Sequence, residues 1–169
     1  MDVKEALLAR RSIRSFTDEP VKKEEIQDLL HAAMSGPSAV NRCPWEFYVV
    51  TNKEKIAELN KVGYAKYSSP LMIVIAGNAF RFLPLGAKDY WVEDASAAAE
   101  NILLQATELG LGGCWCGVHP GKLREKQVRK ILSLPFNIVP FAIIILGHPK
   151  GEVPSPRDQY DEKKIHRID

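Results

Sequence analysis

Three arginines and two serines crowd into seven residues near the N-terminus, in the run Arg10–Phe16. In an extended chain, the alternating side chains of Arg10, Ser12 and Arg14 point to the same side. A guanidinium group grips a phosphate through two parallel hydrogen bonds, and a hydroxyl group adds another donor. The run therefore favours a site for a phosphorylated ligand. The alternative is a solvated cluster at the end of the preceding helix, where cations are also favourable.

A second polar stretch, from Pro37 to Pro44, combines prolines with serine, asparagine and arginine, and its composition predicts a loop. It contains Cys43, the one residue of the chain that suggests a nucleophile. The sequence marks no base that would activate this thiol. We therefore interpret Cys43 as an ordinary loop cysteine.

Two further cysteines, Cys114 and Cys116, are separated by one residue and would share a face of a strand. A zinc site needs about four ligands, and the chain has no second cysteine pair and no histidines at ligand spacing. We interpret the two residues as buried structural thiols, and we expect no metal.

The glycines Gly110, Gly112 and Gly113 resemble part of a dinucleotide-binding loop. That loop lies between a strand and the helix that follows it, whereas here a helix precedes the glycines and a strand follows them. The glycines therefore favour a helix stop and a tight turn. No catalytic side chain is recognisable in the sequence, which favours chemistry carried by a cofactor.

The elements that must position these residues can be predicted from hydrophobic periodicity and from helix stop signals. The expected helices cover residues 3–10, 24–35, 51–62, 89–109 and 122–132, the third with a capping box of Thr51 and Glu54. The expected strands cover residues 45–50, 71–76, 113–118 and 141–146. Residues 148–169 are polar and lack periodicity, so this tail is either poorly ordered or lies across another subunit.

The composition limits the class of protein. The 169 residues suit one domain, 1–169, and the chain is 46% hydrophobic and 26% charged, as soluble globular proteins are. A net charge of +2 is too small to indicate nucleic-acid binding. No apolar run has the length of a membrane span, and three cysteines form no even disulfide framework, so we expect a cytoplasmic protein without membrane association.

Four blocks together resemble the small members of the nitroreductase family of flavoproteins. They are residues 9–16, 36–47, 109–117 and 145–149, with Arg157 after the last. The resemblance implies an α+β fold, a three-layer α/β/α sandwich with a mostly antiparallel central sheet. It also implies an intertwined homodimer with FMN at the subunit interface, in which residues 148–169 wrap around the partner subunit. The connection 77–88 lacks an insertion found in larger members, which leaves the substrate pocket open or completed by the partner.

Carried over by position, the resemblance implies FMN contacts from both subunits. One subunit would supply Arg10, Arg11, Ser12, Arg14, Trp115, Cys116, Gly117, Val118 and Arg157. The partner would supply Pro37, Ser38, Ala39 and Asn41. Arg10 and Arg157 would reach the phosphate, and Arg14 would lie nearer the pyrimidine ring. A backbone N–H of Gly117 or Val118 would lie near the hydride-accepting nitrogen.

The expected function is an NAD(P)H-dependent FMN oxidoreductase that reduces a nitroaromatic, a quinone or a similar flat acceptor by a ping-pong mechanism. Three alternatives stay open: an FMN enzyme with another reductive or oxygen-dependent reaction, a flavin-binding protein without turnover, and an interaction domain with no flavin. The sequence does not decide between NADH and NADPH, or whether Lys66 or Lys150 contacts FMN.

Overall fold

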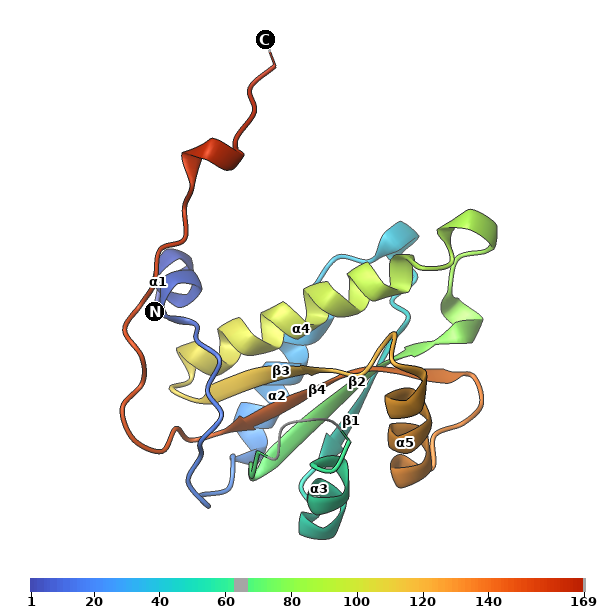
Figure 1. Ribbon diagram of the computed structural model, residues 1–169, viewed down its shortest axis with the longest axis horizontal. Helices are drawn as coiled ribbons and strands as arrows, with labels where there is room; N and C mark the ends of the chain where they lie inside the picture. The colour runs from blue at the N-terminus through green and yellow to red at the C-terminus, as the bar shows by residue number, and fades with distance from the viewer. Residues whose placement is uncertain (63–66, 169) are drawn as a thin grey trace.

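Among residues 1–62 and 67–168, which this computed structural model describes, four antiparallel strands form one sheet in the order β1-β2-β4-β3 (Figure 1). The strands are β1 (Trp45–Val50), β2 (Leu71–Asn78), β3 (Gly112–Gly117) and β4 (Ile138–Gly147). The central pair, β2 and β4, consists almost entirely of apolar residues that are buried on both faces. Such continuous apolar strands require a covering layer on each side of the sheet.

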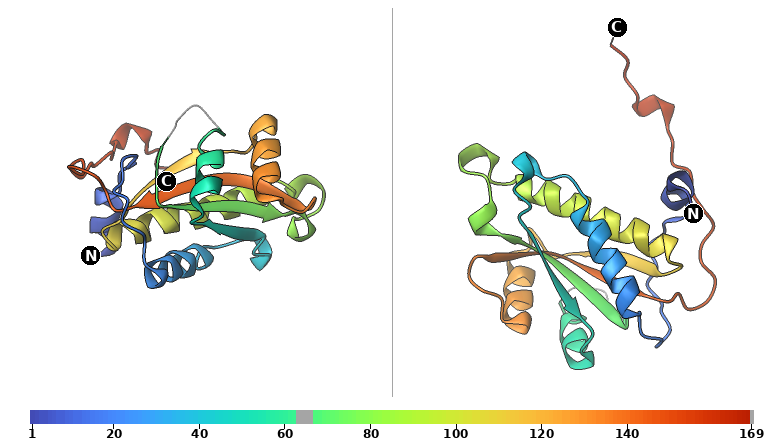
Figure 2. Two further views of the ribbon diagram at one scale, coloured as in Figure 1. Left: turned by 90° about the horizontal axis from the view of Figure 1, so that it is seen from below. Right: turned by 180° about the vertical axis from the view of Figure 1, so that it is seen from behind.

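Helices supply both covering layers (Figure 2). On one face lie α2 (Lys23–Met34) and α4 (Tyr90–Glu108), with α1 (Val3–Ala9) packed against α4. On the other face lie α3 (Lys53–Leu59) and α5 (Lys122–Leu132). Alternate residues of β2 enter the two resulting cores, so Ile73 belongs to the α2/α4 side and Val74 to the α3/α5 side. The three-layer α+β architecture predicted above is confirmed, and no described helix is long and apolar enough to cross a membrane.

Helix α4 approaches the sheet closely because Ala95, Ala98 and Ala99 lie on its buried face with 1% exposure or less. The helix ends at Glu108, and Gly110 then adopts the left-handed conformation, with φ of 72°. This confirms the expected helix stop. Strand β3 begins at Gly112, one residue before the start of the strand expected over 113–118, so Gly112 belongs to the strand and not to the expected turn.

Among the boundaries that differ from the predicted ones, those at the start of α3 and at the start of β4 have clear physical reasons. Helix α3 is capped by Asn52, whose side chain accepts a hydrogen bond from the Lys55 N–H at 2.9 Å, so Thr51 and Glu54 form no capping box there. Strand β4 begins at Ile138 rather than Phe141, because β2 shifts register between Ile75 and Ala76, where Pro140 is accommodated.

The C-terminal tail leaves the body of the chain (Figure 1). Residues 151–168 are all exposed, and their one helical turn is Glu162–Lys164. The tail stays beside α1 through a hydrogen bond from the Arg157 N–H to the Leu8 carbonyl at 3.1 Å. Its wrapping around a partner subunit remains a prediction.

Candidate functional site

The run Arg10–Phe16 leaves α1, meets the start of β3 at its outer edge, and then pairs with the segment after β4 through Phe16 and Pro149. Ser12 pairs with Gly113, and the Ile13 N–H donates to the Gly113 carbonyl at 2.9 Å. A Cβ on Gly112 would lie 2.7 Å from the Ile13 side chain, so glycine permits this close approach. The absence of a side chain at Gly112 therefore helps to place the arginine-rich run against the sheet.

The arginine-rich run and the tail enclose one pocket, a cavity of about 690 Å³. Its predicted site residues are Arg10, Arg11, Ser12, Arg14 and Arg157. Its remaining lining residues are Leu7, Leu8, Pro154, Asp158, Gln159 and Tyr160. The structure thus brings residues from both ends of the sequence into one place, and Arg11 supports this by donating to the Ser155 carbonyl. Their roles toward a cofactor remain predictions.

The arginine pocket has an excess of positive charge, because four guanidinium groups line it and Asp158 is the one carboxylate among its lining residues. Arg10 forms an ion pair with Glu100 of α4, at 3.1 Å between Nε and Oε1. The Arg10 and Glu100 side chains are 31% and 44% exposed, so solvent weakens this pair. The pocket is therefore suited to an anionic ligand that can compete for Arg10.

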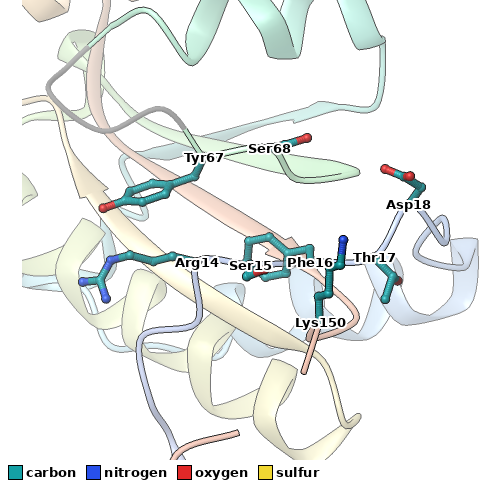
Figure 3. A pocket seen from close by; sticks show the side chains of 8 residues that line it. All are labelled: Arg14, Ser15, Phe16, Thr17, Asp18, Tyr67, Ser68 and Lys150. Atoms are coloured by element: carbon teal, nitrogen blue, oxygen red, sulfur yellow. The ribbon is translucent and has the colours of Figure 1, made fainter. Parts of the chain in front are cut away.

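A second cavity, of about 480 Å³, lies beyond Arg14 (Figure 3). The Cζ atom of Arg14 lies 5.8 Å from the centroid of the Tyr67 ring, and the Arg14 guanidinium group points away from Lys150. Lys150 lines this second cavity and not the arginine pocket, and its N–H donates to the Ser15 carbonyl at 2.9 Å. Lys66 lies outside the described residues.

At the end of β3, successive side chains point to opposite faces of the sheet, and successive N–H groups point to opposite edges of the strand. Trp115 packs edge-on against Phe141, with ring centroids 5.5 Å apart. Cys116 packs against the opposite core but is only half-buried, unlike the buried thiol that we expected. The Val118 N–H is bonded to the Phe141 carbonyl at 3.0 Å, so it points toward β4. Backbone groups alternate along a strand, so the Gly117 N–H points away from β4, toward the side where the arginine-rich run lies. Of the two amides predicted for the cofactor, the direction of Gly117 is thus the suitable one.

Sequence reasoning missed the environment of the two cysteines on β3. Cys114 is buried as predicted, but a hydrogen bond from Cys116, aided by Arg14 and Ser12, lowers the pKa of Cys114 to about 6. The same hydrogen bond, together with burial, raises the pKa of Cys116. The two thiols therefore titrate as a pair, in which the pKa of Cys114 is lowered and that of Cys116 is raised. No sequence signal shows the pairing with the arginine-rich run that creates this environment. Among the described residues no cluster of three metal-ligating side chains occurs.

The loop Pro37–Pro44 lies near the opposite end of α4 from α1 (Figure 1), and none of its residues lines the arginine pocket. The structure therefore does not bring its predicted cofactor residues to the arginines within one chain; these are Pro37, Ser38, Ala39 and Asn41. Cys43 is held inside this loop, where its N–H donates to the Ser38 hydroxyl oxygen at 3.0 Å. Its thiol lies near Ser38 and Asn41, neither of which is a base, in agreement with an ordinary loop cysteine.

Comparison with protein families gives a match to the model described as the nitroreductase family, over residues 7–68 and 63–148. One relative, from Methanothermobacter thermautotrophicus, carries the provisional name NADH dehydrogenase/NAD(P)H nitroreductase. It is 42% identical over 170 residues, which cover 98% of this chain and 86% of the relative.

Solved structures show the same fold. An FMN-dependent nitroreductase from Clostridium difficile is 34% identical, with a TM-score of 0.86 over 99% of both chains. A structure from Clostridium acetobutylicum, provisionally titled an NADH oxidase, is 39% identical, with a TM-score of 0.89 over 95% of this chain and 97% of the other.

Proposed function

The chain belongs to the nitroreductase family, and on that premise we propose that it is an NAD(P)H-dependent FMN oxidoreductase. Its acceptor would be a nitroaromatic, a quinone or a similar flat molecule. The observation that carries this proposal is the arginine pocket, which gathers four arginines beside the exposed edge of a strand.

The chemistry of the arginine pocket fits FMN, which combines a phosphate with a large flat ring. Arg10, Arg11 and Arg157 offer charged donors for the phosphate, and the Ser12 hydroxyl adds a neutral donor. Arg14 lies at the other side of the pocket, against Tyr67, and would face the pyrimidine end of the ring. Positive charge there would stabilise the negative charge that reduction brings to the cofactor.

The end of β3 fits the approach of a flat ring. A Cβ added to Gly117 would meet no atom within 4 Å, so the space next to this residue is open. Its carbonyl accepts a hydrogen bond from Arg124 at 3.0 Å, which helps to hold the backbone after Gly117 in place. Packing of Trp115 on Phe141 fixes the strand from the other side. The Gly117 N–H would therefore be placed to donate a hydrogen bond to the hydride-accepting nitrogen of the FMN ring.

FMN held in this pocket would supply the redox chemistry between NAD(P)H and the acceptor, and one shared pocket for both half-reactions would give ping-pong kinetics. The protein contributes binding, orientation and charge. A second copy of the chain would complete the site, because no residue of the loop Pro37–Pro44 lines the arginine pocket of its own chain. We therefore propose a homodimer that shares its two sites.

The test begins with the visible absorption spectrum of the purified protein, before and after addition of FMN and removal of the excess. We expect retained flavin bands, and oxidation of NADH or NADPH that requires an acceptor and gives parallel double-reciprocal plots. Bound flavin without turnover on any acceptor would contradict the enzymatic proposal, and a protein that does not retain FMN would contradict the cofactor as well. A stable monomer with full FMN occupancy, seen by sedimentation, would contradict the shared site.

A further inference from the structure

One buried carboxylate holds the loop Pro37–Pro44 against α4. Asp94 is 6% exposed, and its Oδ1 accepts a hydrogen bond from the Ala39 N–H at 2.8 Å. The two residues are 55 positions apart in the sequence. A hydrogen bond to a buried charged acceptor is short, directional and costly to lose, so it fixes the position of Ala39 closely.

The backbone of this loop needs such support. Val40, Asn41 and Cys43 adopt the left-handed conformation, with φ of 53°, 52° and 45°. This region is unfavourable for residues other than glycine, and especially for a β-branched residue such as Val40. The surroundings must therefore impose the conformation on the loop.

The other side of the loop is joined to the segment after β2. Arg42 donates through Nε to the Arg81 carbonyl at 3.1 Å, and Arg81 donates in return to the Cys43 carbonyl at 3.3 Å. Despite this support on both sides, the tip points outward, since the Val40 side chain is 82% exposed. The loop is thus built into one shape whose exposed surface contacts little of its own chain.

We propose that Asp94 is a positioning residue that shapes the loop Pro37–Pro44 for the cofactor site of a second copy of this chain. This inference rests on the proposed function. Asp94 itself does not reach the arginine pocket: Arg10 is paired with Glu100, farther along α4, and no residue of the loop lines that pocket. Asp94 acts through the Ala39 N–H, and through it on the residues predicted to contact FMN.

The competing explanation is that Asp94 only stabilises its own subunit, as an acidic residue near the start of a helix also does. Two variants break the hydrogen bond from opposite sides. Asp94→Leu removes the acceptor at similar side-chain size. Ala39→Pro removes the donor, and the extended Ser38 that precedes it, with ψ of 149°, is compatible with a following proline. Asp94→Asn is the matched control, because its amide oxygen can still accept the bond.

Mixed dimers separate the two explanations. One subunit carries Arg10→Ala and the other carries Asp94→Leu, and two different affinity tags select the mixed species. One site then combines intact arginines with an intact loop, while the other site combines both defects. We expect each variant homodimer to bind FMN at least about tenfold more weakly than the parent. The mixed dimer should regain one site per dimer with the affinity of the parent, and Asp94→Asn should bind nearly as the parent does.

Each outcome of these FMN-binding experiments either supports or contradicts the role proposed for Asp94. Absence of the regained site in the mixed dimer, while the parent binds FMN, would overturn the role of Asp94 and leave the proposed function intact. Parent-like binding by the Asp94→Leu homodimer would do the same. A parent that does not bind FMN would instead overturn the proposed function, and the inference with it. If Asp94→Leu does not fold, Ala39→Pro takes its place in the mixed dimer, with the same expected result.

Discussion

Helix α4 holds the two proposed halves of the site, here the arginine end and the loop end, in different ways. At the arginine end, Glu100, near the middle of the helix, forms an ion pair with Arg10 that is open to solvent on both sides. Toward the other end, the buried Asp94 holds the Ala39 N–H through one short hydrogen bond. Exposed ion pairs contribute little and exchange easily, whereas a buried charged acceptor is directional and costly to abandon. The arginine end can therefore adjust to a ligand, while the loop end is formed in advance.

The largest effect should come from the adjustable end. Arg10→Ala removes a charged contact to the FMN phosphate, so we expect binding roughly ten- to a hundredfold weaker, corresponding to about 1.5–3 kcal/mol. Titration of the apoprotein with FMN by fluorescence measures this, and Lys126→Ala, an exposed charge on α5, is the control. Unchanged affinity in Arg10→Ala would show that Arg10 only pairs with Glu100.

Titration of the thiol pair beside Arg14 tests whether the arginine end also stabilises a negative charge that belongs to the protein, namely the Cys114 thiolate. The pKa of Cys114 is lowered from its ordinary 9.0 to about 6, chiefly by the hydrogen bond from Cys116. Cys116→Ser replaces the thiol donor with a hydroxyl donor, whereas Cys116→Ala leaves no donor at this position. In Cys116→Ala we expect the thiolate absorbance of Cys114 to titrate at least about one unit higher, or about 1.4 kcal/mol. An unchanged midpoint would assign the lowered pKa to Arg14 and Ser12 instead.

The lowered pKa of Cys114 also determines how the free energy of unfolding changes with pH. The unfolded chain binds a proton at Cys114 that the folded chain has released, so this residue stabilises the fold more as pH rises from about 6 to 9. The contribution of Cys114 to the free energy of unfolding is lost as the pH falls through about 6. Urea unfolding of the parent and of Cys114→Ala across this range should show a larger rise in the free energy of unfolding in the parent than in the variant.

At the loop end, the comparison can be sharpened by relieving strain. Val40→Asn places a residue that tolerates left-handed backbone at a position with φ of 53° and an exposed side chain. We expect the free energy of unfolding of the apoprotein to rise by about 1 kcal/mol, as measured in urea. The same substitution at Val49, in the extended strand β1, should lower it. Equal effects at the two positions would remove backbone strain as the explanation.

The smallest effect should come from the ion pair itself. Glu100→Gln releases Arg10, so FMN should bind slightly tighter, by less than about fivefold, since exposed pairs are worth about 0.2–1 kcal/mol. Added salt should reduce the difference between this variant and the parent. Markedly weaker binding would mean that Glu100 orients Arg10 for the phosphate, and that the arginine end is also formed in advance.

Local patterns predicted much of the fold. The stripe of Lys122–Leu132 and the β-branched run Trp45–Val50 matched α5 and β1 at both ends, because periodicity and composition act within a few residues. The cap of α3 was misplaced by one residue, since Thr51 and Asn52 are both good caps and only the packing of the helix decides between them.

The candidate site was less predictable. The arginine-rich run was visible as chemistry, but its meeting with Arg157 came from the family resemblance and not from spacing. Asp94 had no local signal at all, because its partner Ala39 lies 55 positions away and is reached only in the folded chain. The lowered pKa of Cys114 likewise depends on Ser12 and Arg14, which the sheet edge brings beside it.

The pairing of Ser12 with Gly113 has a consequence for aggregation. Unpaired strand edges recruit other chains, and here the N-terminal run shields part of the β3 edge. A chain shortened to begin after Ile13 would lose this shield together with Arg10 and Arg11, and β3 would then be an uncovered edge strand of the described sheet. The residues proposed to bind phosphate thus also protect the monomer from edge-to-edge association during folding.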